Sequence, residues 1–258
     1  MDMGISGKNA LVTGGSRGLG RQAALALARE GVNVAIFARG EDRLHETAEE
    51  LRELGVGVSA TVADLGVPEA AGDLLSTVES DLGAVDILVN NVGGSMGTSD
   101  ILNSSVEDFQ NVMEVNLWSA VRLMKLALPG MTDRGWGRVI NISSIYGREH
   151  GGTAPYMTAK AAMIAASKSA AMTLASTGVT VNSIAPGSIL FPGGSWDRFI
   201  NNNTPEAVDE FVDRNLPAGK FGWPEPIGAT VAFLASAHAD LIMGACINVD
   251  GGQSHNLF

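Results

Sequence analysis

Short segments rich in β-branched residues alternate with longer segments that carry apolar residues at helical spacing, along the whole of this 258-residue chain. Parallel strands need long crossover connections, usually helices, so the alternation predicts a parallel sheet covered by helices on both faces. The expected strands are residues 10–13, 32–38, 56–63, 87–90, 139–142, 179–184 and 245–249. The expected helices are residues 19–30, 43–54, 69–82, 107–128, 155–176 and 225–235. We therefore expect an α/β fold with a doubly wound, seven-stranded parallel sheet.

No break in composition and no internal repeat divides the chain, so we expect a single domain over residues 1–258. One irregular stretch, residues 187–215, is rich in Gly, Pro and Asn and follows the sixth expected strand. Loops beyond the carboxyl ends of the strands surround the ligand in a doubly wound sheet, so this stretch is a candidate substrate lid. The alternative is a surface insertion with no role in binding.

The charge and the cysteine content limit the classes of partner. Seventeen basic residues against 28 acidic ones give a net charge of −11, which repels nucleic acids and acidic membrane surfaces. No stretch reaches the roughly 18 consecutive apolar residues of a membrane span, and residues 1–9 hold no apolar run of signal-peptide length. The lone Cys246 cannot form an internal disulfide, so we expect a cytoplasmic protein. No catalytic metal is expected, because the histidines are scattered along the chain: His45, His150, His238 and His255.

A glycine-rich segment at residues 13–20 joins the first expected strand to the first expected helix. Glycines there permit a tight turn and let backbone N–H groups and the helix N-terminus approach a pyrophosphate, as in Rossmann-type dinucleotide-binding folds. The alternative is a device for close packing of the helix on the sheet. The candidate cofactor-binding residues of this segment are Gly14, Ser16, Arg17, Gly18, Leu19 and Gly20.

The residues at the end of the second expected strand predict which dinucleotide binds. A carboxylate there would bind the ribose diol of NAD, whereas a cation would receive the extra phosphate of NADP. This chain has the uncharged Ala38 followed by Arg39, and Arg17 of the glycine segment can approach the same side. We therefore expect NADP(H) to be preferred over NAD(H). The alternative is that Arg39 is a solvated charge at a strand end.

Several further motifs follow in order: Asp64-Leu65, Asn90-Asn91-Val92-Gly93, Asn116, Ser144, Tyr156 with Lys160, Pro186-Gly187 and Val249-Asp250-Gly251-Gly252. Together with the glycine segment they resemble the short-chain dehydrogenase/reductase family from end to end. The resemblance implies an oxidoreductase that interconverts a small-molecule alcohol and its ketone or aldehyde by hydride transfer. It also places these residues along the cofactor: Asp64, Leu65, Asn90, Val92, Gly93, Tyr156, Lys160, Pro186, Gly187 and Ile189.

The expected catalytic residues are Asn116, Ser144, Tyr156 and Lys160. Four residues apart on a helix, Tyr156 and Lys160 project from one face, so the ammonium can act on the phenol. A free tyrosine has a pKa of about 10, so use as a base near pH 7 needs roughly 4 kcal/mol of electrostatic help. The resemblance implies that Ser144 hydrogen-bonds the substrate oxygen. It also implies that Asn116 holds a water molecule linked to Lys160. Ser143 is a rival for the serine role, although the family's Ser-x-x-Gly pattern fits Ser144.

Three positions depart from the family pattern. Val92 replaces a smaller alanine close to the cofactor, Phe191 stands where relatives often carry a threonine that contacts the nicotinamide amide, and Pro226 replaces an acidic residue at a helix start. The contact from position 191 is therefore in doubt.

The identity of the substrate is left almost undetermined by the sequence, because one fold hosts many different reactions. The candidate pocket residues are Ser95, Met96, Ser144, Tyr146, His150, Phe191, Trp196 and Phe199.

A 3-oxoacyl-acyl-carrier-protein reductase is the alternative, because residues 219–252 resemble that group. Thr177 stands where such enzymes commonly have an arginine for their acidic carrier. A catalytically silent NADP-binding regulator is a third hypothesis. The resemblance further implies a homo-oligomer, a tetramer or dimer, built through residues 107–128 and 155–176.

Overall fold

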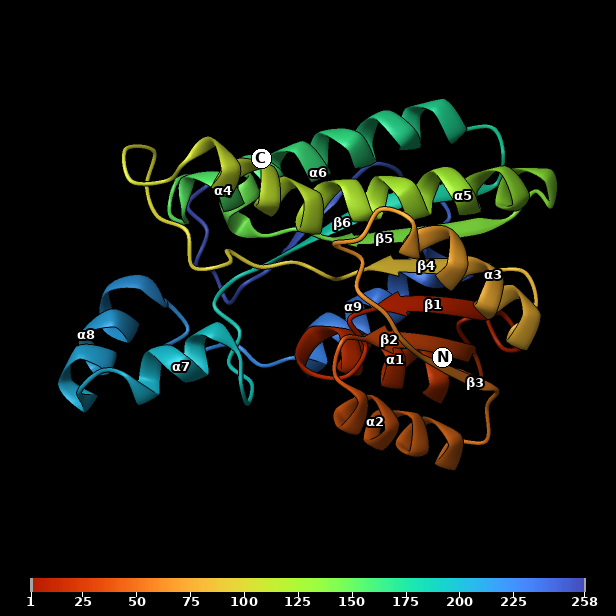
Figure 1. Ribbon diagram of the computed structural model, residues 1–258, viewed down its shortest axis with the longest axis horizontal. Helices are drawn as coiled ribbons and strands as arrows, with labels where there is room; N and C mark the ends of the chain where they lie inside the picture. The colour runs from red at the N-terminus through yellow and green to blue at the C-terminus, as the bar shows by residue number, and fades with distance from the viewer. Residues whose placement is uncertain (1, 258) are drawn as a thin grey trace.

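The computed structural model describes residues 2–257, and within them seven parallel strands form one sheet in the order β3-β2-β1-β4-β5-β6-β7 (Figure 1). The strands are β1 (Asn9–Thr13), β2 (Asn33–Ala38), β3 (Val58–Val62), β4 (Ile87–Asn90), β5 (Gly137–Ile142), β6 (Val179–Pro186) and β7 (Cys246–Val249). The order reverses direction beside β1, because the chain moves outward to β3 and then returns to place β4 on the other side of β1. The prediction of a doubly wound, seven-stranded parallel sheet is confirmed.

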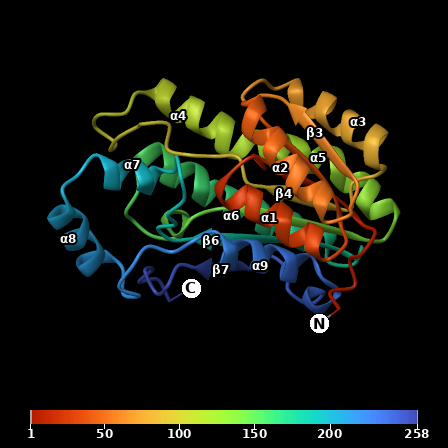
Figure 2. The same ribbon diagram turned by 90° about the horizontal axis from the view of Figure 1, so that it is seen from below.

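Helices cover both faces of the sheet (Figures 1 and 2). They are α1 (Gly18–Arg29), α2 (Glu41–Glu53), α3 (Ala70–Leu82), α4 (Val106–Met113), α5 (Ser119–Asp133), α6 (Ala154–Leu174), α7 (Ser195–Asn201), α8 (Pro205–Asn215) and α9 (Glu225–Ala235). Successive strand residues point to opposite faces, so Val12 packs in the core under α1, α2 and α9, whereas Leu11 packs in the core under α3, α5 and α6. The strands read as continuous apolar runs because both faces are buried.

The structure does not have one continuous helix over residues 107–128, where the sequence predicted one. It is divided into α4 and α5 by a π-helical turn over Glu114–Trp118, and α5 runs on to Asp133. Its start is capped by Ser105, whose Oγ accepts from the N–H of Asp108 at 3.1 Å while the Asp108 carboxylate accepts from the N–H of Ser105 at 2.8 Å. A π turn inside a helix often marks a functional position, and Asn116 lies in this one.

The stretch 187–215 is not irregular throughout, because it contains α7 and α8. Thr204 caps α8 through its Oγ1, which accepts from the N–H of Ala207, and Pro205 occupies the first turn. Both views place α7 and α8 together at one end of the molecule, beyond the carboxyl ends of the strands. We call residues 187–215 the lid segment.

No helix in the described part of the chain combines the length and the apolar character that crossing a membrane requires.

Candidate active site

A glycine-rich turn at residues 13–20 joins β1 to α1 and forms one wall of a pocket. Gly14 has a φ of 67°, and a Cβ there would lie 3.1 Å from Asn91 Nδ2, so glycine lets the turn lie close to the end of β4. Gly20 packs on the carbonyl oxygen of Gly14 with no room for a Cβ. Gly14 therefore lines the pocket beside the N-terminus of α1, where a phosphate-binding cradle is expected.

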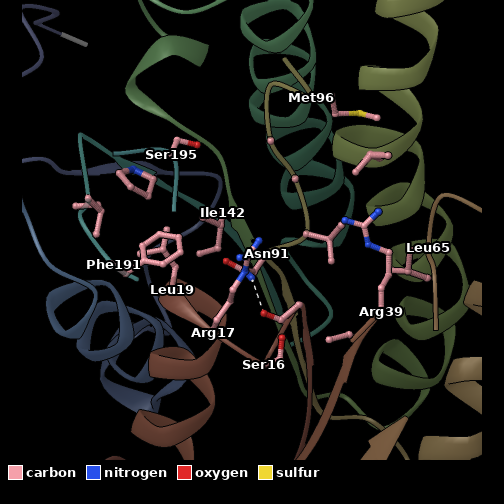
Figure 3. Close-up of a pocket in the computed structure, with 18 of the residues that line it drawn as sticks. Ser16, Arg17, Leu19, Arg39, Leu65, Asn91, Met96, Ile142, Phe191 and Ser195 are labelled. Atoms are coloured by element: carbon pink, nitrogen blue, oxygen red, sulfur yellow. Dashed lines mark hydrogen bonds between the residues drawn. The ribbon is translucent and has the colours of Figure 1, made fainter. Parts of the chain in front are cut away.

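The pocket has a volume of about 720 Å³, a size typical of ligand sites, and runs along the carboxyl ends of the strands. Figure 3 shows Arg39 and Leu65 on one side of it and Phe191 and Ser195 on the other. The expected site residues that line it are Gly14, Ser16, Arg17, Leu19, Arg39, Asp64, Leu65, Val92, Gly93, Met96, Ser144, Tyr156, Lys160, Pro186, Gly187, Ile189, Phe191 and Trp196.

Several expected site residues lie behind or beside this wall. Gly18 supports it, because the ring of Phe191 packs against the Gly18 Cα with no room for a Cβ. The expected residues that are not part of the wall are Gly18, Gly20, Ser95, Asn90, Asn116, Tyr146, His150 and Phe199.

The two asparagines after β4 point in different directions. Asn90 is buried at 3% exposure, and its Nδ2 donates to Asn141 Oδ1 at 2.8 Å inside the sheet. Asn91 instead lines the pocket, where its Nδ2 donates to the carbonyl oxygen of Thr13 at 2.9 Å. Asn91 therefore ties the end of β4 to the glycine-rich turn, a role that the sequence analysis did not assign. The alternation of side chains along a strand was the signal that distinguishes the two.

Arginines gather at the end of the pocket beside β2 and α2. Arg17, Arg39 and Arg43 line it there, and Ala38 at the end of β2 brings no carboxylate. Burial, followed by the guanidinium groups of Arg43, Arg198 and Arg39, lowers the pKa of Arg17. The sequence analysis missed Arg43, although its place four residues after Arg39 was a usable signal.

Lys160 and Tyr156 lie on α6 with their polar groups at the pocket. The Lys160 ammonium is 3% exposed, donates to the carbonyl oxygen of Ile142 at 2.9 Å and lies 5.6 Å from the centre of the Tyr156 ring. Burial lowers the pKa of Lys160 to about 8. Burial also raises the pKa of Tyr156, opposed by a hydrogen bond with Ser144. With these groups alone, the effect of burial outweighs the hydrogen bond with Ser144, so Tyr156 keeps its proton at neutral pH.

The two adjacent serines after β5 make different contacts. Ser143 Oγ donates to the backbone carbonyl of Lys160 at 3.0 Å and so holds α6 to β5. Ser144 Oγ accepts from the N–H of Tyr146 at 3.1 Å and bonds the Tyr156 side chain. Gly147 fits the Ser-x-x-Gly pattern because its Cα packs against the backbone of Lys160 without room for a Cβ. The hydroxyl that reaches the tyrosine is thus that of Ser144.

Asn116 connects the π-helical turn to the loop after β4. Its Oδ1 accepts from the N–H of Gly94 and its Nδ2 donates to the carbonyl of Gly94, both at 2.9 Å. A Cβ on Gly93 would lie 2.9 Å from Lys160 Nζ and even closer to Asn116 Oδ1. Asn116 Oδ1 and Lys160 Nζ therefore both lie against Gly93, on the side where a Cβ would project, and Gly93 lines the pocket.

The rest of the pocket lining combines apolar side chains with hydroxyls. Met96, Phe191 and Trp196 are apolar lining residues, and Ser144, Ser195 and Tyr156 supply hydroxyls. No group of three or more His, Cys, Asp or Glu side chains among residues 2–257 is arranged to hold a metal ion.

Comparisons with known proteins point to one family. A family model described as short chain dehydrogenase matches residues 8–198. The chain is 37% identical over 256 residues to the 3-oxoacyl-acyl-carrier-protein reductase FabG of Vibrio cholerae. The alignment covers 97% of this chain and 99% of the relative.

Solved structures give the same result. L-Sorbose reductase from Gluconobacter frateurii, complexed with NADPH and L-sorbose, superposes with a TM-score of 0.93 at 34% identity and covers 100% of both chains. A 7α-hydroxysteroid dehydrogenase complexed with NADH and 7-oxo glycochenodeoxycholic acid superposes with a TM-score of 0.89 at 29% identity, over 100% of this chain and 98% of that one.

Proposed function

The chain belongs to the short-chain dehydrogenase family, and from that premise we propose that it is an NADP-dependent oxidoreductase that interconverts a free small-molecule alcohol and its ketone or aldehyde. The observation that carries the proposal is the meeting of Tyr156, Ser144 and Lys160 at one end of a pocket whose other end holds three arginines. Neither end alone defines a reaction, but together they hold a proton donor and a cation-rich phosphate site in one cavity.

The residues fit a dinucleotide. Gly14 and Gly93 line the pocket, where a side chain would crowd Asn91 and Asn116, and Asp64 and Leu65 line it after β3. A bound nicotinamide cofactor supplies or accepts the hydride.

The reaction needs a proton at the carbonyl oxygen. In reduction, Tyr156 donates its phenolic proton to that oxygen, and Ser144 donates a hydrogen bond that stabilises the developing charge. The raised pKa of Tyr156 keeps this proton in place at neutral pH. The Lys160 ammonium, with Asn116 beside it at Gly93, replaces the proton from solvent. The alcohol is oxidised by the reverse steps.

NADP is favoured over NAD by the charges at the end of β2. Arg39 and Arg43 can each pair with a phosphate, whereas a carboxylate suited to a ribose diol is absent from the described end of that strand.

A free substrate is favoured over an acyl carrier protein by the charge beside the substrate end. The helix α8 packs on α7 through Phe211 and Trp196, whose ring centres lie 4.8 Å apart, and Trp196 lines the pocket. The exposed face of α8 is acidic, with Glu206, Asp209, Glu210 and Asp213. This face repels an acidic carrier. The carrier-protein reductase remains the second candidate because of the 37% identity to the Vibrio cholerae enzyme.

The test is a spectrophotometric panel of ketones, aldehydes, sugars, polyols and acetoacetyl-acyl-carrier protein, each with NADPH and with NADH. We expect turnover of a free carbonyl compound with a higher kcat/KM for NADPH. Faster reduction of the carrier-protein substrate than of any free ketone would reverse the choice of substrate. Absence of all turnover would leave a silent NADP-binding protein.

The matched variant is Tyr156→Phe, which removes only the hydroxyl. It should bind NADPH with unchanged affinity and lose kcat by several orders of magnitude, because the proton donor is gone. An undiminished kcat would exclude Tyr156 as the acid. We further propose that the protein works in the cytoplasm.

A further inference from the structure

The lid segment is attached to the glycine-rich turn through one backbone carbonyl. Gly193 O accepts from Arg17 in the turn, at 3.1 Å from its Nη1, and from Arg198 on α7, at 2.8 Å from its Nη1. The Phe191 ring two residues earlier packs on Gly18 of the same turn. The start of the lid segment therefore lies directly on the phosphate cradle. It holds the guanidinium groups of Arg17, from the turn, and of Arg198, from α7, side by side.

Three arginines, Arg17, Arg39 and Arg43, line this end of the pocket, and a fourth, Arg198, lies beside Arg17 on α7 outside the pocket wall. A Cβ on Gly193 would lie 3.1 Å from Arg17 Nη1 and 3.4 Å from Arg43 Nη1, so α2 also reaches the lid segment. The four guanidinium groups are close enough that those of Arg43, Arg198 and Arg39 lower the pKa of Arg17, after the effect of burial.

Within residues 2–257 none of these four cations forms an ion pair, although the Asp197 carboxylate lies at the same turn, where it accepts from the N–H of Gly193 at 2.8 Å. Arg39 and Arg43 make no hydrogen bond or ion pair within residues 2–257, and Arg17 and Arg198 are bonded to a carbonyl and a hydroxyl rather than to a carboxylate. Glu41 and Asp42 line the pocket nearby. Neither carboxylate comes within ion-pair distance of the four arginines in the described chain.

We propose that Arg198 of the lid segment completes, with Arg17, Arg39 and Arg43, a four-arginine site for the 2′-phosphate of NADP, so that this phosphate holds the lid segment closed. The inference rests on the proposed function. Like charges gathered without a counter-ion repel one another, and a phosphate dianion placed among them reverses that cost. Because Arg198 is on α7, the gain is realised only while the lid segment lies on the cradle.

Two consequences follow from this attachment. NADPH should slow opening of the lid segment, whereas NADH, which lacks the 2′-phosphate, should not. The cofactor should also bind before the substrate, because α7 carries both Arg198 and the pocket residue Trp196.

The experiment compares Kd for NADPH and NADH in the full-length protein and in Arg198→Gln, by titration calorimetry. We expect the variant to bind NADPH about tenfold more weakly and NADH within about twofold of the parent value. Arg198→Lys, which keeps the charge, should recover part of the loss. Arg214→Gln is the matched control, because Arg214 is an exposed arginine on α8 that pairs with Glu210 away from the cluster.

Hydrogen exchange of residues 193–203 provides a readout of the lid segment itself. NADPH should slow exchange there in the parent protein and much less in Arg198→Gln. Equal losses for NADPH and NADH, or a loss in Arg214→Gln as large as in Arg198→Gln, would overturn the inference. Failure of the parent protein to bind NADPH would instead overturn the proposed function.

Discussion

The buried ammonium of Lys160 makes the site sensitive to pH. Its pKa of about 8 lies below the ordinary value of 10.5, so the group loses its proton above pH 8 in the folded protein. Tyr156 keeps its proton there because burial raises its pKa. We expect kcat/KM for carbonyl reduction to fall above pH 8, because deprotonated Lys160 then has no proton to pass to Tyr156.

Rates measured from pH 6 to 10 check this prediction. Between pH 8 and 10.5 the unfolded chain binds more protons at Lys160 than the folded protein, so this residue makes the free energy of unfolding rise with pH. A loss of activity between pH 8 and 10.5 therefore does not arise because deprotonation of Lys160 unfolds the protein. In Lys160→Arg the guanidinium does not release its proton, so the relay should fail, kcat/KM should fall at every pH, and the limb near pH 8 should disappear. A limb near pH 8 that survives in this variant would exclude Lys160 as its origin.

The roles of single residues could be predicted from the sequence where local backbone geometry decides them. The helical spacing of Tyr156 and Lys160 brought them together at the pocket, as predicted. The choice between Ser143 and Ser144 needed the structure, because adjacent residues after a strand take different partners. Arg198 could not be assigned to the cofactor end from sequence, because it comes from the lid segment and reaches Gly193 only through the folded turn.

The lid segment is held together by an aromatic cluster, which we define as Trp196, Phe199, Phe211 and Phe221. Phe211 contacts all three other rings, with centres 4.8, 5.2 and 5.8 Å away, and is not part of the pocket wall. In Phe211→Ala the loss of three contacts should destabilise the closed lid segment by about 2 kcal/mol. We expect KM for the carbonyl substrate to rise roughly tenfold, because Trp196 is then less firmly placed.

The measurement is steady-state kinetics together with thermal unfolding. The melting temperature should change little, because the lid segment can open without unfolding the sheet. Phe233→Ala removes a partly exposed phenylalanine from α9 and should leave KM unchanged. Equal KM values for both variants would show that the aromatic cluster does not position the substrate wall.

Among the elements, continuous apolar runs were read most reliably. The strand expected over 87–90 coincides with β4, whereas the one expected over 56–63 is shorter at both ends as β3, because Gly57 and Ala63 bound it. The lid helices were missed because Gly and Asn dominate their surroundings. Thr204 followed by Pro205 was a readable start signal for α8.

At the scale of the whole molecule, α4, α5 and α6 form one layer over the sheet (Figure 1). Exposed apolar side chains lie on α5, on α6 and in the π-helical turn before α5. Trp118 is 46% exposed next to α5, Leu126 is 45% exposed on α5, and Met172 is 63% exposed on α6. The remaining outward face of α6 is rich in Ala and Ser, which permits close approach of another helix. This face suits association between copies of the chain through α5 and α6.

Light scattering after size exclusion should therefore give about four chain masses, or two if one symmetric interface forms. In Trp118→Glu combined with Met172→Glu, buried like charges would face one another across the symmetry axis, so the mass should fall to a smaller species. Leu54→Glu, at an exposed apolar residue at the end of α2 (40% exposed), should leave the mass unchanged. A monomeric parent protein, or a double variant of unchanged mass, would contradict assembly through these helices.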